Sequence, residues 1–138
     1  QRKFIKHING VESFSEGNLT VNNLRFTSYL NGAVYEYTID STLPKSSSSR
    51  TIKYSKDSGT AGILLQKVVK DTTIDAVNYV SKFTYRGKDN SDLGPTPTAT
   101  DVYGVELTFY LLRGESFYKY TTYATIDEDQ LSSGSTRY

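Results

Sequence analysis

The chain has 138 residues, 16 basic and 15 acidic side chains and a formal net charge of +1, which is the size of a single domain over residues 1–138. It has no cysteine and one histidine, His7, so disulfides, thiolate metal sites and catalytic thiols are excluded, and histidine-based triads and zinc sites nearly so. The longest apolar run, 62–65, is too short to span a membrane, and the near-neutral charge means that any basic site must be local.

The first predicted element is a hairpin centred on Asn9-Gly10. Its two strands are expected over 4–8 and 11–14. An Asn-Gly dipeptide is a strong hairpin signal, because both residues tolerate the positive φ that a type I′ turn requires.

The same dipeptide at Asn31-Gly32 predicts a second hairpin. Counting outward from a two-residue turn places mostly apolar residues opposite one another on one face: Leu30 opposite Ala33, Ser28 opposite Tyr35, Phe26 opposite Tyr37 and Leu24 opposite Ile39. A slip of one residue would mix polar and apolar side chains on each face, so the turn and the pattern favour the same register.

Three more strands are predicted in the middle of the chain, over 50–56, 61–69 and 77–86. The apolar positions of 61–69 also fit one face of a helix, and strand is the interpretation adopted here. Proline and serine mark the segments 41–49 and 88–100 as loops.

The clearest alternation of apolar and polar residues runs over 103–111, and 117–126 follows with a composition rich in tyrosine and threonine. A two-residue turn at Gly114-Glu115 would join these strands. The resulting register pairs Leu111 with Tyr118, Phe109 with Tyr120, Leu107 with Thr122 and Val105 with Ala124.

Together these elements predict an all-β or β-rich fold, an antiparallel meander of about seven to nine strands. Little helix is expected except near the C-terminus. There, the pattern of 115–131 fits either a strand or a helix with a poor apolar stripe. The tail that begins at Asp127 is compatible with one helical turn.

Catalysis is not indicated by the distribution of carboxylates, most of which lie in predicted turns. Glu36 and Glu106 lie within strands and are the two candidates for an acid/base pair, with a cross-strand salt bridge as the simpler interpretation. We therefore expect a protein that is not an enzyme and that needs no metal or other cofactor.

The polar faces of three predicted strands carry cations, hydroxyls and one aromatic side chain. If these strands are neighbours, one sheet face would present Lys53, Lys82, Thr84, Arg86 and Tyr110. Lysine and arginine neutralise phosphates, and tyrosine stacks on unpaired bases. The pattern therefore predicts an interface for single-stranded RNA, although solvated sheet faces commonly carry lysine and threonine in any case.

Twelve tyrosines are more than a core of this size can bury with every hydroxyl satisfied. Exposed tyrosines suit contacts with proteins, sugars or bases. The alternative function is therefore a tyrosine-rich β-sandwich module that binds a carbohydrate or a protein receptor, in a cell-surface or phage-fibre protein with an extracellular location.

Short segments at 17–21 (Gly-Asn-Leu-Thr-Val), Phe26, 31–35 (Asn-Gly-Ala-Val-Tyr) and the terminal Tyr138, together with the order of elements, resemble the coat proteins of small icosahedral single-stranded RNA bacteriophages. The resemblance implies an N-terminal hairpin before a five-stranded meander, two C-terminal helices, and a homodimer that assembles into a shell around RNA. It makes a self-assembling structural virion protein the leading expectation.

Overall fold

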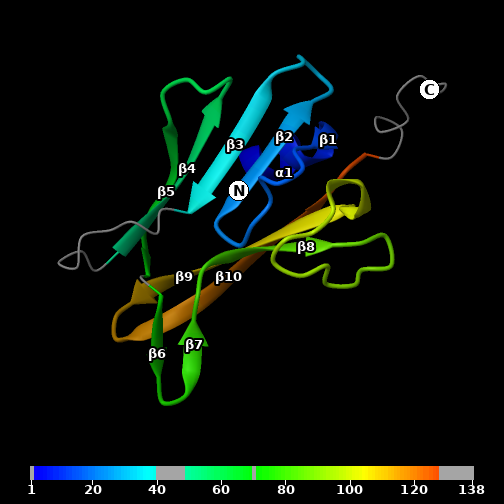
Figure 1. The fold of residues 1–138 in the computed structure, drawn as a ribbon. Helices are drawn as coiled ribbons and strands as arrows, with labels where there is room; N and C mark the ends of the chain where they lie inside the picture. The colour runs from blue at the N-terminus through cyan, green and yellow to red at the C-terminus, as the bar shows by residue number, and fades with distance from the viewer. Residues whose placement is uncertain (1, 40–48, 70, 128–138) are drawn as a thin grey trace.

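The computed structural model describes residues 2–39, 49–69 and 71–127 and confirms a strand-rich antiparallel fold (Figure 1). Within these described residues there is one α-helix, α1 (Arg2–Asn9), and a 3-10 turn, η1 (Ala99–Asp101). The strands are β1 (Val11–Phe14), β2 (Asn23–Ser28), β3 (Val34–Ile39), β4 (Ser49–Lys56), β5 (Gly62–Val69), β6 (Thr72–Ile74), β7 (Val77–Tyr79), β8 (Lys82–Arg86), β9 (Gly104–Arg113) and β10 (Ser116–Thr125).

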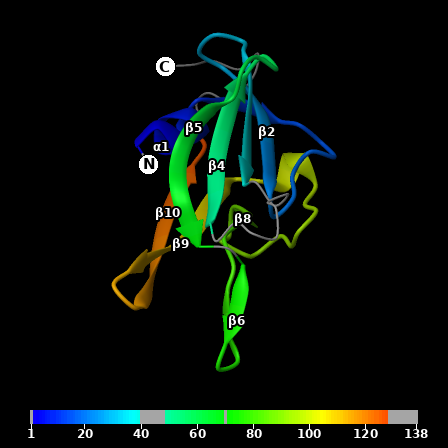
Figure 2. The same ribbon diagram turned by 90° about the vertical axis from the view of Figure 1, so that its left-hand side faces the viewer.

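Eight of these strands form one sheet in the order β1-β2-β3-β4-β5-β9-β10, with β8 also paired to β9. Strand β5 meets β9 at Val68 and Leu111, whereas β8 pairs with the opposite end of β9, over 104–108. The sheet therefore has a first half, β1 to β5, and a second half, β8 to β10. Strand β5 curves along its length to connect them (Figure 2).

Helix α1 holds the two halves together through a buried aromatic side chain. Phe4 is fully buried and lies edge-on to Tyr37 of β3, with ring centroids 5.5 Å apart. Its other neighbour is Phe83 of β8, at 6.4 Å in a stacked arrangement. Nearby, the backbone N–H of Phe83 donates to the carbonyl of Val21 at 2.9 Å. The core is thus enclosed by both halves and the helix.

The predicted hairpin at Asn9-Gly10 is wrong, because the residues before it form α1. Phe4 and Ile8 are four residues apart, a spacing that places both on one face of a strand or of a helix. Both are fully buried in the helix. The N–H of Gly10 donates to the carbonyls of Lys6 and His7, so this dipeptide ends a helix instead of turning a hairpin.

The hairpin at Asn31-Gly32 exists, but its predicted register is wrong by two residues. Phe26 lies opposite Tyr35 instead of Tyr37. The loop has four residues, 29–32, closed by the N–H of Ser28 donating to the carbonyl of Ala33 at 2.8 Å. A shift of two preserves the side to which each residue points, so the predicted core face is retained. Gly32 has the expected positive φ, 68°.

The hairpin at Gly114-Glu115 is confirmed with its predicted register, including Leu111 opposite Tyr118 and Val105 opposite Ala124. Gly114 has φ of 64°, as the two-residue turn requires. Because β10 runs over Ser116–Thr125, the helical alternative for 115–131 is wrong in its described part. The tail from 128 onward lies outside the described residues.

The middle of the chain forms more and shorter strands than the sequence predicted. The predicted strands over 50–56 and 61–69 are confirmed as β4 and β5. The segment 77–86 instead splits into β7 and β8, and β7 pairs with β6 in a separate hairpin. Asp75 and Ala76 form its turn with φ of 52° and 66°, a role in which glycine or asparagine is usual.

Candidate functional site

Four of the five predicted site residues share one side of the second half of the sheet. Lys82, Thr84 and Arg86 alternate along β8, with Lys82 opposite Thr108 of β9 and Thr84 opposite Glu106. Tyr110 follows two positions after Thr108 on the same side. We call this side, which faces away from the core residues Phe83 and Leu107, the outer face of β8–β9–β10.

Lys53 does not join this group. It lies on β4 opposite Thr38, and it lines a hollow of about 380 Å³ with Glu36 and Ser55. Strand β5 separates β4 from β9, so the predicted adjacency of Lys53 to the other four residues is wrong. Strand order depends on long-range pairing, which alternation along one strand cannot supply.

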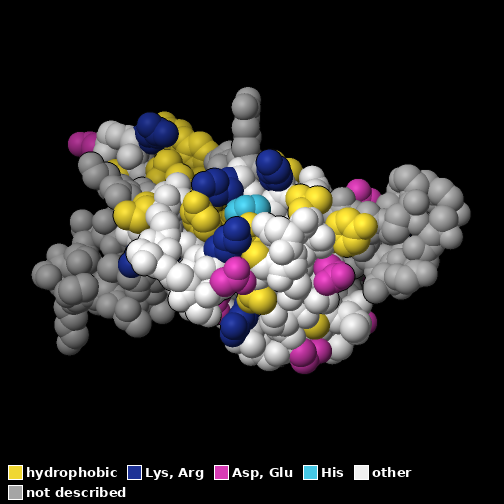
Figure 3. Space-filling model, turned by 90° about the horizontal axis from the view of Figure 1, so that it is seen from above, with side chains coloured by type: hydrophobic (Ala, Val, Ile, Leu, Met, Phe, Trp, Pro, Cys, Tyr) yellow, Lys and Arg dark blue, Asp and Glu magenta, His cyan; other side chains and the backbone are white. Residues whose placement is uncertain are grey.

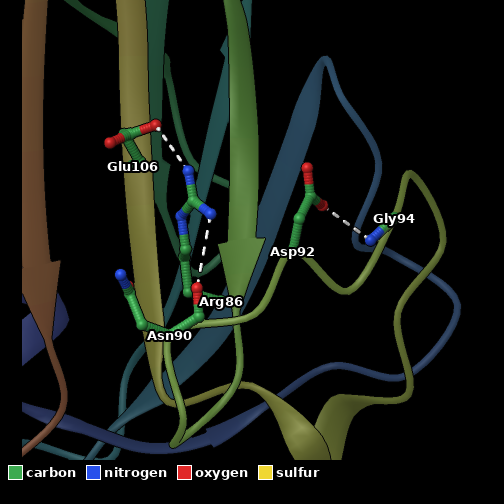
Figure 4. A network of polar contacts seen from close by, with 5 residues as sticks. All are labelled: Arg86, Asn90, Asp92, Gly94 and Glu106. Atoms are coloured by element: carbon green, nitrogen blue, oxygen red, sulfur yellow. Dashed lines mark hydrogen bonds and ion pairs between the residues drawn. The ribbon is translucent and has the colours of Figure 1, made fainter.

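The side chain of Arg86 is engaged in contacts within the protein. Its guanidinium forms an ion pair with Glu106 at 3.4 Å and donates to the carbonyl of Asn90 at the same distance (Figure 4). The carboxylate of Asp92 accepts from the N–H of Gly94 in the same loop. Arg86 therefore ties the loop after β8 to β9, and its charge is balanced by a carboxylate.

Thr84 is also unsuited to binding RNA, since it is buried and only 8% exposed. It lies opposite Glu106 and two residues before Arg86, so the ion pair runs beside it on the outer face. The side chain of Arg86 is still 27% exposed, but Lys82 and Tyr110 are the two predicted residues of the outer face that are neither buried nor held in this ion pair.

Lys119 is the cation that sequence reasoning missed. It lies directly opposite Tyr110 across β9 and β10, and its side chain is exposed, as is that of Lys82. The register predicted from the Gly114-Glu115 turn already implied this pair. A lysine beside a half-buried tyrosine thus replaces Lys53 and Arg86 as the polar centre of the outer face.

Three further aromatic side chains extend this centre. The ring of Tyr79 from β7 lies edge-on to Tyr110 at 5.3 Å and to Phe117 at 4.9 Å. Tyr123 is 41% exposed, and its hydroxyl lies over Gly104, where a Cβ atom would approach it to 2.5 Å. Aromatic rings therefore cover both ends of the outer face, with lysines between and beside them.

The two strand carboxylates considered for acid/base chemistry do not converge. Glu36 lies on β3 in the first half of the sheet and accepts a hydrogen bond from the amide of Asn23 at 3.2 Å. Glu106 lies on β9 in the second half and is paired with Arg86. With β4 and β5 between their strands, they do not form an acid/base pair.

Within 2–39, 49–69 and 71–127, no group of three or more histidine, aspartate or glutamate side chains is arranged to hold a metal ion. In the same ranges, no helix has the length and apolar character needed to cross a membrane.

Comparison with known proteins gives no relative: no family model, no curated protein and no solved structure matches the chain. The site is therefore interpreted from its own geometry.

Proposed function

We propose that this protein is a non-enzymatic structural subunit that self-associates and binds single-stranded RNA on the outer face of β8–β9–β10. The observation that carries the proposal is the pair formed by the exposed Lys119 and the half-buried Tyr110, directly opposite each other on the outer face. A cation beside an aromatic ring offers a phosphate contact and a stacking surface within one nucleotide's reach.

The composition of the face favours an unpaired strand over a duplex. Lys82 and Lys119 are its exposed lysines, and the net charge of the whole chain is +1. Two phosphate contacts supply little of the electrostatic affinity on which duplex binders depend. The aromatic cluster of Tyr79, Tyr110 and Phe117 would contribute through stacking, which requires bases that are not already stacked in a helix.

Self-association is supported by the free edge of β10. This strand has ten residues and pairs with β9 on one side, whereas no described strand pairs with its other side. Its far end is partly covered, because the amide of Asn9 donates to the carbonyl of Thr125. Leu112 and Tyr118, next to the turn, are 57% and 52% exposed. Long open edges of this kind invite pairing with another chain.

A two-fold pairing of β10 with β10 of a second copy would satisfy this edge and is the symmetry usual for homodimers. It would also place two outer faces side by side in one continuous sheet, which lengthens the surface for RNA. We further propose that such dimers assemble into a shell and that the protein is located in a virion.

The RNA interface is tested with a double variant, Lys82→Ala with Lys119→Ala, and binding to a short oligouridine measured by fluorescence anisotropy at several salt concentrations. The dependence of log affinity on log salt should flatten by roughly 0.7 for each lost phosphate contact. The matched control is Lys53→Ala with Lys56→Ala, which removes the same charge from the first half of the sheet. Equal slopes for the two double variants would exclude the outer face as the RNA site.

Self-association is tested by sedimentation and negative-stain microscopy of the wild-type chain. Dimers or particles that contain nucleic acid are expected. A well-folded monomer that does not associate at micromolar concentration would remove the structural-subunit proposal. Binding to glycans without binding to RNA would instead favour the alternative of a tyrosine-rich recognition module.

A further inference from the structure

A second polar site lies on the first half of the sheet, away from the outer face of β8–β9–β10. It is a pocket of about 370 Å³ between α1 and the loop that joins β2 to β3. The helix contributes Lys3, Lys6 and His7, and the rest of the lining is Ser28, Leu30, Asn31 and Tyr35. Figure 3 shows the single histidine flanked by lysine and arginine side chains on this side of the molecule.

His7 is held in a defined orientation by two tyrosines of β3. Its Nδ1 atom is 2.5 Å from the hydroxyl of Tyr37, and its ring centroid lies 4.3 Å from that of Tyr35. The imidazole therefore cannot rotate without breaking a partly buried hydrogen bond. The remaining ring nitrogen, Nε2, forms no hydrogen bond with a described residue.

The proton positions follow from the surroundings of these groups. Burial raises the pKa of Tyr37, so its hydroxyl stays protonated. This hydroxyl donates a hydrogen bond to Nδ1 of His7, its one acceptor among the described residues. Burial, and then the charges of Lys3 and Lys6, lower the pKa of His7. At neutral pH the ring is therefore uncharged and carries its proton on Nε2, which makes this atom a hydrogen-bond donor.

The two lysines bring positive charge that the pocket does not balance. Lys3 donates to the hydroxyl of Tyr54 at 2.6 Å and lies over that ring at 4.7 Å, so its partner is uncharged. Lys6 is exposed, and the described residues that line the pocket include no carboxylate. Two lysines and a histidine with an N–H donor therefore line one pocket.

Asn31 adds a preorganised amide to this set. Its side-chain oxygen accepts from the N–H of Ala33 at 3.0 Å, and its nitrogen donates to the hydroxyl of Tyr35 at 3.1 Å. The second hydrogen of that nitrogen stays available for a ligand. The polar groups of the pocket are thus mainly donors, and the complementary ligand is an anion with several acceptor oxygens.

We infer that this pocket binds a small organic phosphate, with Lys3 and Lys6 on the phosphate oxygens and Nε2 of His7 donating to one of them. A phosphate monoester carries nearly two negative charges at neutral pH, which matches two lysines, whereas each phosphate of an RNA backbone carries one. The volume lies at the lower end of the range for small-molecule sites, which suits a sugar phosphate better than a polymer.

The inference does not depend on the proposed RNA interface, because the two sites use different residues on different halves of the sheet. An RNA strand and a free sugar phosphate both present phosphate oxygens, so the experiment must separate these sources. It uses the full wild-type chain with three probes: ribose 5-phosphate, ribose, and the oligouridine described above.

Binding is followed by NMR through the ring protons of His7 and by calorimetry. Ribose 5-phosphate should bind saturably and raise the pKa of His7, since an anion at Nε2 favours the charged imidazole. Ribose should not bind. Lys6→Ala, a change at an exposed position, should weaken binding by about tenfold or more, the loss expected for one charge-assisted hydrogen bond. Lys82→Ala with Lys119→Ala should leave it unchanged.

Two results would overturn the inference. One is the absence of any shift of the His7 resonances at millimolar ribose 5-phosphate. The other is a response of His7 to oligouridine alone, abolished by Lys6→Ala, which would make the pocket an RNA contact. Loss of RNA binding in Lys82→Ala with Lys119→Ala has no bearing on the pocket, so the two proposals fail separately.

Discussion

The rings of Phe4 and Phe83 stack with their centroids 6.4 Å apart, which joins the N-terminal helix to the second half of the sheet. Both side chains are buried, and Phe4 also contacts Tyr37 of the first half. One aromatic residue of α1 therefore links two parts of the sheet whose described strands, β5 and β9, are paired at Val68 and Leu111.

Replacing Phe4 with alanine should lower the free energy of unfolding by about 3–5 kcal/mol, because the change removes buried contacts and leaves a cavity. Chemical denaturation followed by tyrosine fluorescence measures this loss. Ile5→Ala is the control, since Ile5 is 38% exposed on the same helix, and it should cost about 1 kcal/mol or less. Equal losses for the two variants would contradict the placement of Phe4.

Gly32→Val should cost on the order of 1 to 3 kcal/mol, because φ at this position is 68° and a β-branched residue is strained there. A Cβ atom at Gly32 would meet no atom within 4 Å, so the cost comes from the backbone alone. Gly32→Asn should be much milder, since asparagine tolerates this conformation. Similar stabilities for the two variants in urea would argue against the observed loop.

Tyr110→Ala should weaken oligouridine binding by about 1 to 3 kcal/mol through lost stacking, with little change in its salt dependence. The matched control is Tyr118→Ala, which removes an exposed tyrosine of the same hairpin that points to the opposite side of the sheet. Anisotropy titrations of both variants at two salt concentrations make the comparison. An equal effect of both changes would argue against stacking on the outer face.

The lowered pKa of His7 predicts a specific pH dependence of stability. In the unfolded chain the imidazole titrates near its ordinary value of 6.5, and in the folded chain it binds its proton less readily. The unfolded state therefore holds more protons as the pH falls through 6.5, so this contribution to stability is complete above that value and declines below it. Urea midpoints at pH 7.5 and pH 5.5 measure the decline.

The control for this prediction is His7→Gln, which has no titratable ring. Its stability should change less than that of the wild-type chain between the two pH values. An equal or larger change in the variant would show that other groups control the pH dependence.

Residues near one another in the chain were sufficient to predict the hairpin of β9 and β10. Strict alternation, together with a turn at Gly114 that needs a positive φ, leaves one register that keeps Leu107 and Phe109 on the buried side. The same reasoning yielded the correct faces of β2 and β3 and the conformation of Gly32. This reasoning did not predict which residues of β2 and β3 lie opposite one another. A loop of four residues leaves each side chain on the same face of the sheet as a loop of two does, so the apolar pattern cannot distinguish the two registers.

Contacts between distant parts of the chain decided the remaining features. Phe4 and Ile8 suit a strand or a helix by their spacing, and burial against Phe83 and Tyr37 favours the helix. The candidate sites depend on contacts of the same kind. Lys53 is separated from Tyr110 because β5 pairs between β4 and β9, and the pocket around His7 exists because α1 packs on the β2–β3 hairpin. Local pattern specifies which side of a strand is apolar, whereas strand order and helix docking arise from burial of the whole core.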